Sequence, residues 1–170
     1  EKPSRSPLKS GIGLVTDMAQ AEYIANLSKT DYLANLPSID LPANFKGKSR
    51  AFVMDGSEME YHQNGLHHGD ILLCQSVSVK SKDLQLGKIH TIVLGNRIVT
   101  RRLTEITNKE LILSADDPNY EAVTIAKKEV LELWEVKGVY STYLNPPKMI
   151  EERVMLLESK LEEMLKKLSS

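Results

Sequence analysis

Short apolar runs, separated by residues that favour turns, fill most of the chain after the first ten residues. The runs are rich in Val, Ile and Leu, and Gly, Pro, Asn and Asp stand between them. Runs of this length and composition predict β-strands rather than helices. We expect strands at 11–15, 51–54, 69–77, 87–94, 97–103, 110–114, 123–125 and 130–139. The pattern therefore predicts a mainly β domain over residues 11–144.

The segments between these runs carry their own signals. Gly95-Asn96 separates two of the runs and is a residue pair typical of a primed hairpin turn. Residues 31–42 predict a short helical turn, followed by an extended segment bounded by prolines. The polar stretches 43–49 and 60–68 are expected to be loops.

The period of the apolar positions changes after Pro147. Apolar residues then recur at intervals of four and three, with charged residues on the flanks. This spacing is the a/d seam of a coiled coil and predicts an amphipathic helix over 147–168. A lone helix of this length is marginal in water, so we expect it to pair in a homodimer. The alternative is that it folds back onto its own sheet. The expected dimerisation residues are Ile150, Val154, Leu157, Leu161, Met164 and Leu168.

Composition fits one globular domain with an appendage, because 41% of the 170 residues are apolar and 26% are charged. The formal net charge of -1 provides no basic field for nucleic acid, so another segment must contact DNA if the intact protein binds it. Cys74 is the sole cysteine, which excludes an intrachain disulfide and suits a reducing cytoplasm. No apolar run is long enough to span a bilayer. Residues 1–10, rich in Pro, Ser and basic residues, predict an extended linker.

Two stretches carry the candidate chemistry. Gly56-Ser57-Glu58-Met59 follows an apolar run, and Val99-Thr100-Arg101-Arg102-Leu103 follows the predicted hairpin turn. They resemble the active-site segments of the self-cleaving peptidase domain of LexA-like and phage repressors. That family has Gly-(polar)-Ser-Met, with the serine as nucleophile, and Val-Lys-Arg-(apolar), with the lysine as general base. The resemblance implies a LexA-type, highly curved β fold over 11–144. It places Glu58 at the serine position and Arg101 at the lysine position.

The bond that the family cleaves is altered as well. Relatives have Ala-Gln-Ala-Gly-Tyr where this chain has Ala19-Gln20-Ala21-Glu22-Tyr23. The resemblance therefore places the former cleavage site at Ala21 and Glu22. Because nucleophile, base and cleaved bond have all changed, we interpret the domain as a peptidase relative without autoproteolytic activity. The resemblance also implies a transcription regulator that binds DNA through an N-terminal helix-turn-helix domain outside this sequence.

The two substituted residues suggest a different role for the site. Arginine stays protonated at any working pH and cannot act as a base, and a carboxylate is a poor nucleophile towards an amide. We therefore expect Glu58 and Arg101 to form a bidentate ion pair. The alternative is an active peptidase that uses Ser57, one position earlier, although alternation along a strand turns neighbouring side chains apart. The lysines that could then serve as a base are Lys48, Lys80, Lys82 and Lys88.

Three histidines share one predicted loop with two glutamates. Their spacing matches no standard zinc pattern, so we expect a solvated polar loop, no metal and no cofactor. These residues are His62, His67 and His68, with Glu58 and Glu60.

Overall fold

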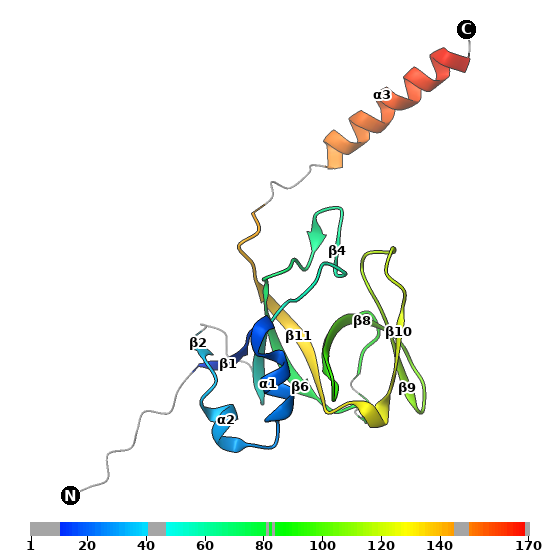
Figure 1. The fold of residues 1–170 in the computed structure, drawn as a ribbon. Coiled ribbons are helices and arrows are strands. Elements are labelled where there is room, and N and C mark those ends of the chain that lie inside the picture. Colours follow the sequence, from blue (N-terminus) through cyan, green and yellow to red (C-terminus); the bar gives the residue numbers. More distant parts are fainter. Residues whose placement is uncertain (1–10, 41–46, 81, 83, 145–149, 169–170) are drawn as a thin grey trace, which may run out of the picture.

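The computed structural model describes residues 11–40, 47–80, 82, 84–144 and 150–168, with the side chains of the C-terminal helix described from Arg153 onward. The predicted linker, residues 1–10, lies outside the described residues, as do Pro146 and Pro147 and the side chain of Ile150. Figure 1 shows a β-rich body and a separate C-terminal helix. The prediction of a mainly β chain with a C-terminal helix is confirmed.

The elements follow one another along the chain with short connections. In order they are β1 (Ile12–Val15), η1 (Asp17–Ala19), α1 (Gln20–Ala25), α2 (Thr30–Ala34), β2 (Ser38–Ile39), β3 (Ser49–Val53), β4 (Glu60–Tyr61), β5 (Asn64–Gly65), β6 (Ile71–Val77), β7 (Ile89–Val93), β8 (Ile98–Ile106), β9 (Glu110–Ser114), β10 (Val123–Ala126), η2 (Lys127–Glu129), β11 (Glu132–Tyr140) and α3 (Ile150–Leu168).

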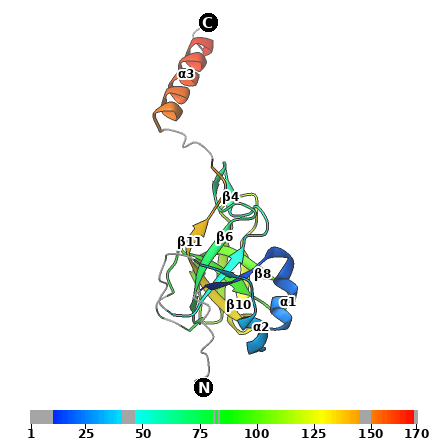
Figure 2. The same cartoon turned by 90° about the vertical axis from the view of Figure 1, so that its left-hand side faces the viewer.

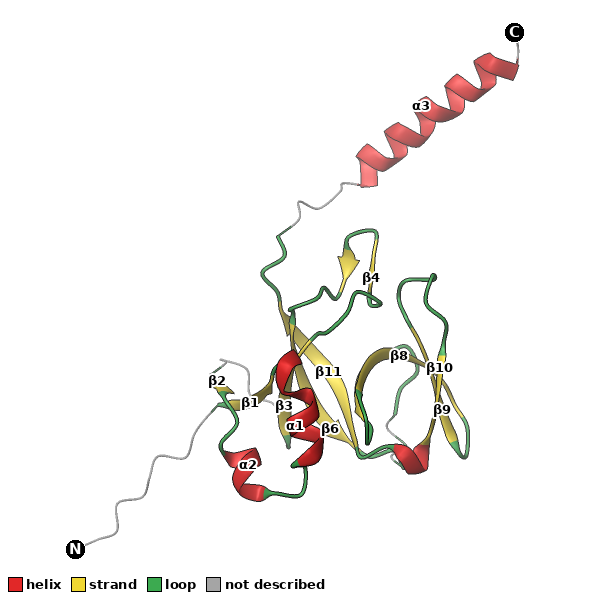
Figure 3. Cartoon of the chain, in the orientation of Figure 1, coloured by secondary structure: helices red, strands yellow, loops and turns green. Residues whose placement is uncertain are grey.

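Within the described residues, one sheet runs in the order β10-β9-β8-β7-β11-β6-β3-β1-β2, and β4 and β5 form a small separate ribbon. Strand β1 pairs with β3 in parallel, and the other neighbouring pairs are antiparallel. The predicted hairpin joins β7 to β8 around Gly95-Asn96, where the Leu94 N–H donates to the Arg97 carbonyl at 2.9 Å. Figure 3 shows β8, β9 and β10 curling away from β6 and β11.

The sheet is packed on both faces because its central strands are apolar on both sides. On β7, Val93 belongs to one buried cluster and its neighbour Ile92 to the other. The first cluster centres on an aromatic row in which Phe52 meets Tyr23 at 5.9 Å and Trp134 at 5.8 Å between ring centroids. The second cluster lies under β8, β9 and β10 and contains Leu103, Leu111, Leu113 and Ile125.

Helix α1 is attached to the sheet by Tyr23, which is fully buried against β3. Figure 2 shows α1 and α2 together at one side of the body. The sequence pattern did not predict η1 and α1, since neither segment carries an apolar period of its own.

The predicted loop at 60–68 contains the ribbon of β4 and β5. His62 and Gln63 both have positive φ, at 50° and 64°, which is the backbone of a primed two-residue turn. The pair His62-Gln63 lacks the Asn-Gly signature of such turns, so the sequence pattern did not predict this ribbon.

Every described side chain of α3, from Arg153 to Leu168, is exposed. The seam residue Val154 is 45% exposed and Leu161 is 58% exposed. The helix therefore does not fold back onto its own sheet, and its apolar stripe has no covering surface within the described residues.

Candidate functional site

The turn that carries Ser57 and Glu58 is held between two buried methionines. Met54 and Met59 are 1% and 0% exposed, and Met54 exchanges backbone hydrogen bonds with Gly69 and Asp70 at 2.9 and 2.8 Å. The intervening residues must reverse direction over a short distance. Gly56 makes this possible with a φ of +94°, a conformation that side chains disfavour. The anchored turn presents Glu58 to β8.

Strand β8 presents its adjacent arginines to different surroundings, as strand alternation requires. Arg102 forms a bidentate contact with Asp116, through Nε at 2.7 Å and Nη2 at 2.6 Å, and also donates to the Gly87 carbonyl at 2.6 Å. The hydrogen bonds that Arg102 donates to Asp116 raise the pKa of Arg102. Arg101 instead faces the turn that carries Glu58.

Glu58 and Arg101 approach each other but do not form the predicted bidentate contact. The shortest separation, from Arg101 Nη1 to Glu58 Oε1, is 3.6 Å, which is an ion pair beyond hydrogen-bonding distance. The Arg101 guanidinium lies over the Tyr120 ring at 5.6 Å, and the Glu58 carboxylate folds against Gly56. These two contacts set the side-chain positions and keep the planar groups apart. The bidentate geometry expected here occurs at the neighbouring arginine.

The pair is largely shielded from solvent. The side chains of Arg101 and Glu58 are 11% and 18% exposed. Arg101 Nε and Nη1 are buried without a hydrogen-bond acceptor. A buried guanidinium with unsatisfied donors is costly, so the nearby carboxylate is its main compensation.

A second turn, at residues 115–120, covers this pair. The Asp117 N–H donates to the Glu58 carbonyl at 3.1 Å, and the Ser57 and Tyr120 hydroxyl oxygens are 3.2 Å apart. Among the described residues, Ser57 thus meets a phenol and no amine. Tyr120 was not predicted as a site residue. The position of this turn follows from the register of β8 and β9, in which Ser114 pairs with Arg102 just before it.

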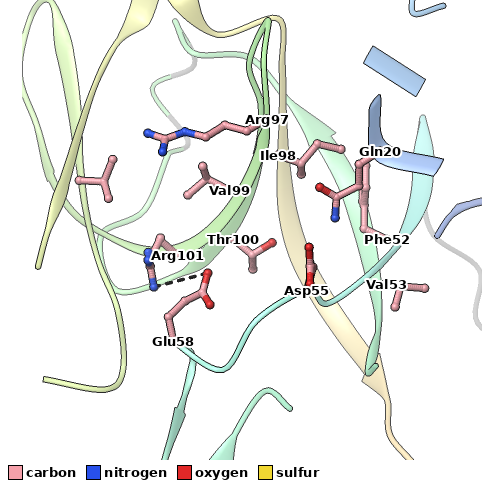
Figure 4. A pocket seen from close by; sticks show the side chains of 11 residues that line it. Gln20, Phe52, Val53, Asp55, Glu58, Arg97, Ile98, Val99, Thr100 and Arg101 are labelled. Carbon is pink, nitrogen blue, oxygen red and sulfur yellow. Dashed lines mark ion pairs between the residues drawn. The ribbon is translucent and has the colours of Figure 1, made fainter. Parts of the chain in front are cut away.

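The pair borders an open cavity of about 240 Å³ (Figure 4). Its charged residues balance, with Asp55 and Glu58 opposite Arg97 and Arg101. No lysine lies among its described lining residues. The lining consists of Gln20, Phe52, Val53, Asp55, Glu58, Arg97, Ile98, Val99, Thr100, Arg101 and Val123.

The lysines considered as alternative bases lie elsewhere. Lys48 pairs with Glu132 at 3.2 Å, beside the Trp134 ring. Lys88 lines a different cavity, together with Glu135 and Lys137. Lys80 and Lys82 are likewise outside the lining of the cavity at Glu58.

The Ala21–Glu22 peptide lies inside α1 and not in an extended segment. The neighbouring Tyr23 fixes this helix, because its hydroxyl donates to Glu132 Oε2 at 2.6 Å. Burial raises the pKa of Tyr23 well above its ordinary value, and the hydrogen bond to Glu132 adds to the effect. Gln20, at the start of α1, reaches the cavity wall.

The histidines of the 60–68 segment make separate contacts. His67 stacks on Tyr143 at 3.7 Å and lies 3.5 Å from Asp70. His68 Nδ1 accepts from the Gly56 N–H at 3.3 Å, and His62 packs against Tyr61. Among the residues the structure describes, no group of three or more His, Cys, Asp or Glu side chains is placed to hold a metal ion.

His90 is a buried titratable group that the sequence pattern did not single out. It is 1% exposed, its Nδ1 lies 3.2 Å from the Lys88 carbonyl, and its Nε2 has no hydrogen-bond partner. Burial lowers the pKa of His90, so its neutral form is favoured in the folded protein.

Comparison of the sequence with profiles of known protein families gives no match, and comparison with curated protein sequences gives none either. Among the described helices, none combines the length and the apolar character required to cross a bilayer.

Proposed function

We propose that this chain is the regulatory and dimerisation region of a LexA-like or phage-repressor-like transcription regulator that has lost autoproteolysis. The observation that carries the proposal is the Arg101–Glu58 ion pair at 3.6 Å. The resemblance assigns these two positions to a general base and a nucleophile, and such groups must lie close together. Their proximity supports the alignment on which the proposal rests, and their chemistry excludes them from the catalytic roles.

The proposed fold is the LexA-type curved β domain. The long sheet with separate clusters on its two faces is compatible with that architecture. The helical backbone at Ala21–Glu22 also favours the inactive interpretation, because a bond inside a packed helix is poorly presented for cleavage. The Ser57 alternative gains no support from the geometry, since this hydroxyl faces Tyr120 and the described residues that line the cavity include no lysine.

In the proposed regulator, DNA is bound by a separate N-terminal helix-turn-helix domain. Two copies of the present chain hold two such domains together, and a two-fold protein then matches a palindromic operator. Because self-cleavage cannot detach the DNA-binding domains from the dimerised region, release from DNA requires a different signal.

The assembly role can be tested by fusing residues 11–170 to a monomeric DNA-binding head with a known palindromic operator. The proposal predicts tighter and cooperative binding of the fusion relative to the head alone, measured by mobility shift. Binding no tighter than that of the head would contradict the dimerisation role. The DNA-binding part is tested separately by the coding sequence upstream, which should encode a helix-turn-helix domain.

A further inference from the structure

Helix α3 carries a charge pattern that specifies how two copies would pair. The a positions of its heptads are Val154, Leu161 and Leu168, and the d positions described with side chains are Leu157 and Met164. A β-branched residue at a followed by Leu at d, as in Val154 and Leu157, is the combination that favours two strands.

The flanks of the seam have opposite charges. The g positions are Arg153, Lys160 and Lys167, and the e positions described with side chains are Glu158 and Leu165, so among them Arg153 with Glu158 is the contact between opposite charges. In a parallel coiled coil, each g residue faces the e residue five positions later on the other helix. Arg153 of one copy therefore faces Glu158 of the second copy, and the two-fold axis repeats this contact.

An antiparallel pair would oppose these charges. It brings g positions beside g positions and e positions beside e positions, so the basic residues would meet basic residues and Glu158 would meet Glu158 of the second copy. Like charges at these positions destabilise the pair and select against the arrangement.

Arg153 and Glu158 have no opposite charge at helical spacing within their own helix. The residues three and four positions away from Arg153 are apolar, and Glu158 has only apolar or acidic residues at those positions. In the described structure both side chains are exposed and neither forms an ion pair. Lys167, in contrast, pairs with Glu163 within the helix at 2.7 Å.

We infer that α3 forms a parallel, in-register, two-stranded coiled coil with α3 of a second copy of this chain. The inference deepens the proposed function and rests on it, because it names the surface through which the region dimerises. The parallel arrangement attaches both β domains at the same end of the coiled coil. Two DNA-binding heads would then lie on one side of the dimer, as a palindromic site requires.

The orientation is tested by disulfide cross-linking of the full chain. In the parallel dimer, Val154→Cys faces its own counterpart, and mild oxidation should give a covalent dimer. Ser159→Cys lies at the outer f position of the same helix and should cross-link poorly, which makes it the matched control. The native Cys74 is buried and burial raises its pKa to about 12, so it should stay inert.

In an antiparallel dimer, residue 154 would instead lie beside residue 164. Cross-linking seen only when Val154→Cys and Met164→Cys chains are mixed would overturn the parallel orientation.

The surface is tested by sedimentation of two matched variants. Leu161 at an a position and Leu156 at the outer c position are 58% and 60% exposed, so Asp at either site removes a similarly exposed leucine. Leu161→Asp should give a monomer, and Leu156→Asp should leave the dimer unchanged. A dimer that persists in Leu161→Asp would refute the helix interface while leaving the proposed assembly role intact. A monomeric wild-type chain at high concentration would refute both, and a trimer or tetramer would refute the two-stranded assignment.

The contact between Arg153 and Glu158 of the second copy is tested in the same assay. Glu158→Lys should weaken the dimer roughly fivefold, because both symmetric contacts become repulsive. The exchange Arg153→Glu with Glu158→Lys should recover most of the affinity. Glu162→Lys, at the outer b position, changes the net charge equally and should have little effect. Equal weakening by Glu158→Lys and Glu162→Lys would show that the g–e contacts do not form.

Discussion

Removing Glu58 should destabilise the fold, because Arg101 would stay buried without its opposite charge. At the observed 3.6 Å, the attraction between unit charges is about 4 to 5 kcal/mol for an effective dielectric constant of about 20. Desolvation of both groups offsets much of this attraction, so the net value of the intact pair is small. The variant loses the attraction but keeps the desolvated guanidinium, whose Nε and Nη1 already lack acceptors.

We expect Glu58→Ala to lower the free energy of unfolding by about 2 to 4 kcal/mol, towards the range for breaking buried pairs. Arg101→Ala should cost about as much, because it leaves Glu58 shielded at 18% exposure and removes the contact with Tyr120. Replacing both with apolar residues of similar size, Glu58→Leu with Arg101→Met, should cost less than either truncation alone.

The assay is a double-mutant cycle measured by urea unfolding at neutral pH. Opposite charges that interact should give a coupling energy of about 1 kcal/mol or more. Ser57→Ala is the control, since it changes the adjacent residue and removes one hydroxyl contact without disturbing a charge. If each single variant lowers the free energy of unfolding by less than about 0.5 kcal/mol and the two show no coupling, Glu58 does not compensate the buried charge of Arg101.

Three further predictions concern residues around the site and the core. Burial lowers the pKa of His90 from an unfolded value of about 6.5, so its contribution to the free energy of unfolding is fully present above that pH and is lost below it by up to about 1.4 kcal/mol per pH unit. Urea unfolding from pH 7.5 to 5 should show a smaller pH dependence for His90→Asn than for the wild type. Equal slopes would contradict the assignment to His90. Gly56→Ala should lower the free energy of unfolding by about 2 kcal/mol, because φ is +94° and the new methyl group meets the Glu58 carboxylate. A smaller loss in the Glu58→Ala background, measured by thermal unfolding, would identify that contact as a cause. An equal loss would show that backbone strain is the sole cause. Tyr23→Phe should lower the free energy of unfolding by about 1 to 2 kcal/mol by removing the hydrogen bond to Glu132, and Tyr23→Ala by about 3 to 5 kcal/mol by leaving a cavity in the core. Amide hydrogen exchange in α1 should become faster in both variants. Unchanged exchange would show that Tyr23 does not hold the helix.

The longer strands could be predicted because each is a short apolar run with side chains buried on one or both faces, whereas the two-residue strands β4 and β5 could not. The hairpin of β7 and β8 needed only the Gly95-Asn96 signal between two such runs. Helix α1 could not be predicted from an apolar period, since one residue, Tyr23, provides its buried anchor. The parallel pairing of β1 with β3 also has no local signal, because register with a distant strand is set by tertiary packing.

The structure brings Glu58 and Arg101 within 3.6 Å of each other, but the predicted bidentate contact between them does not form. Glu58 and Arg101 could be brought together only through the resemblance, since no local rule links residues so far apart in the sequence. Their separation depends on the Tyr120 ring and on the folding of Glu58 against Gly56, which no spacing reveals. The bidentate contact belongs to Arg102 and Asp116, because strand alternation points Arg102 away from the turn at Glu58.

We propose that charged, non-reactive groups occupy the positions of a former catalytic dyad. The most direct test is the intact mass of the purified full chain after prolonged incubation at alkaline pH, beside a Ser57→Ala control. We expect one unchanged mass in both samples. Two fragments that meet between Ala21 and Glu22, formed by the wild-type chain and absent from the control, would contradict it.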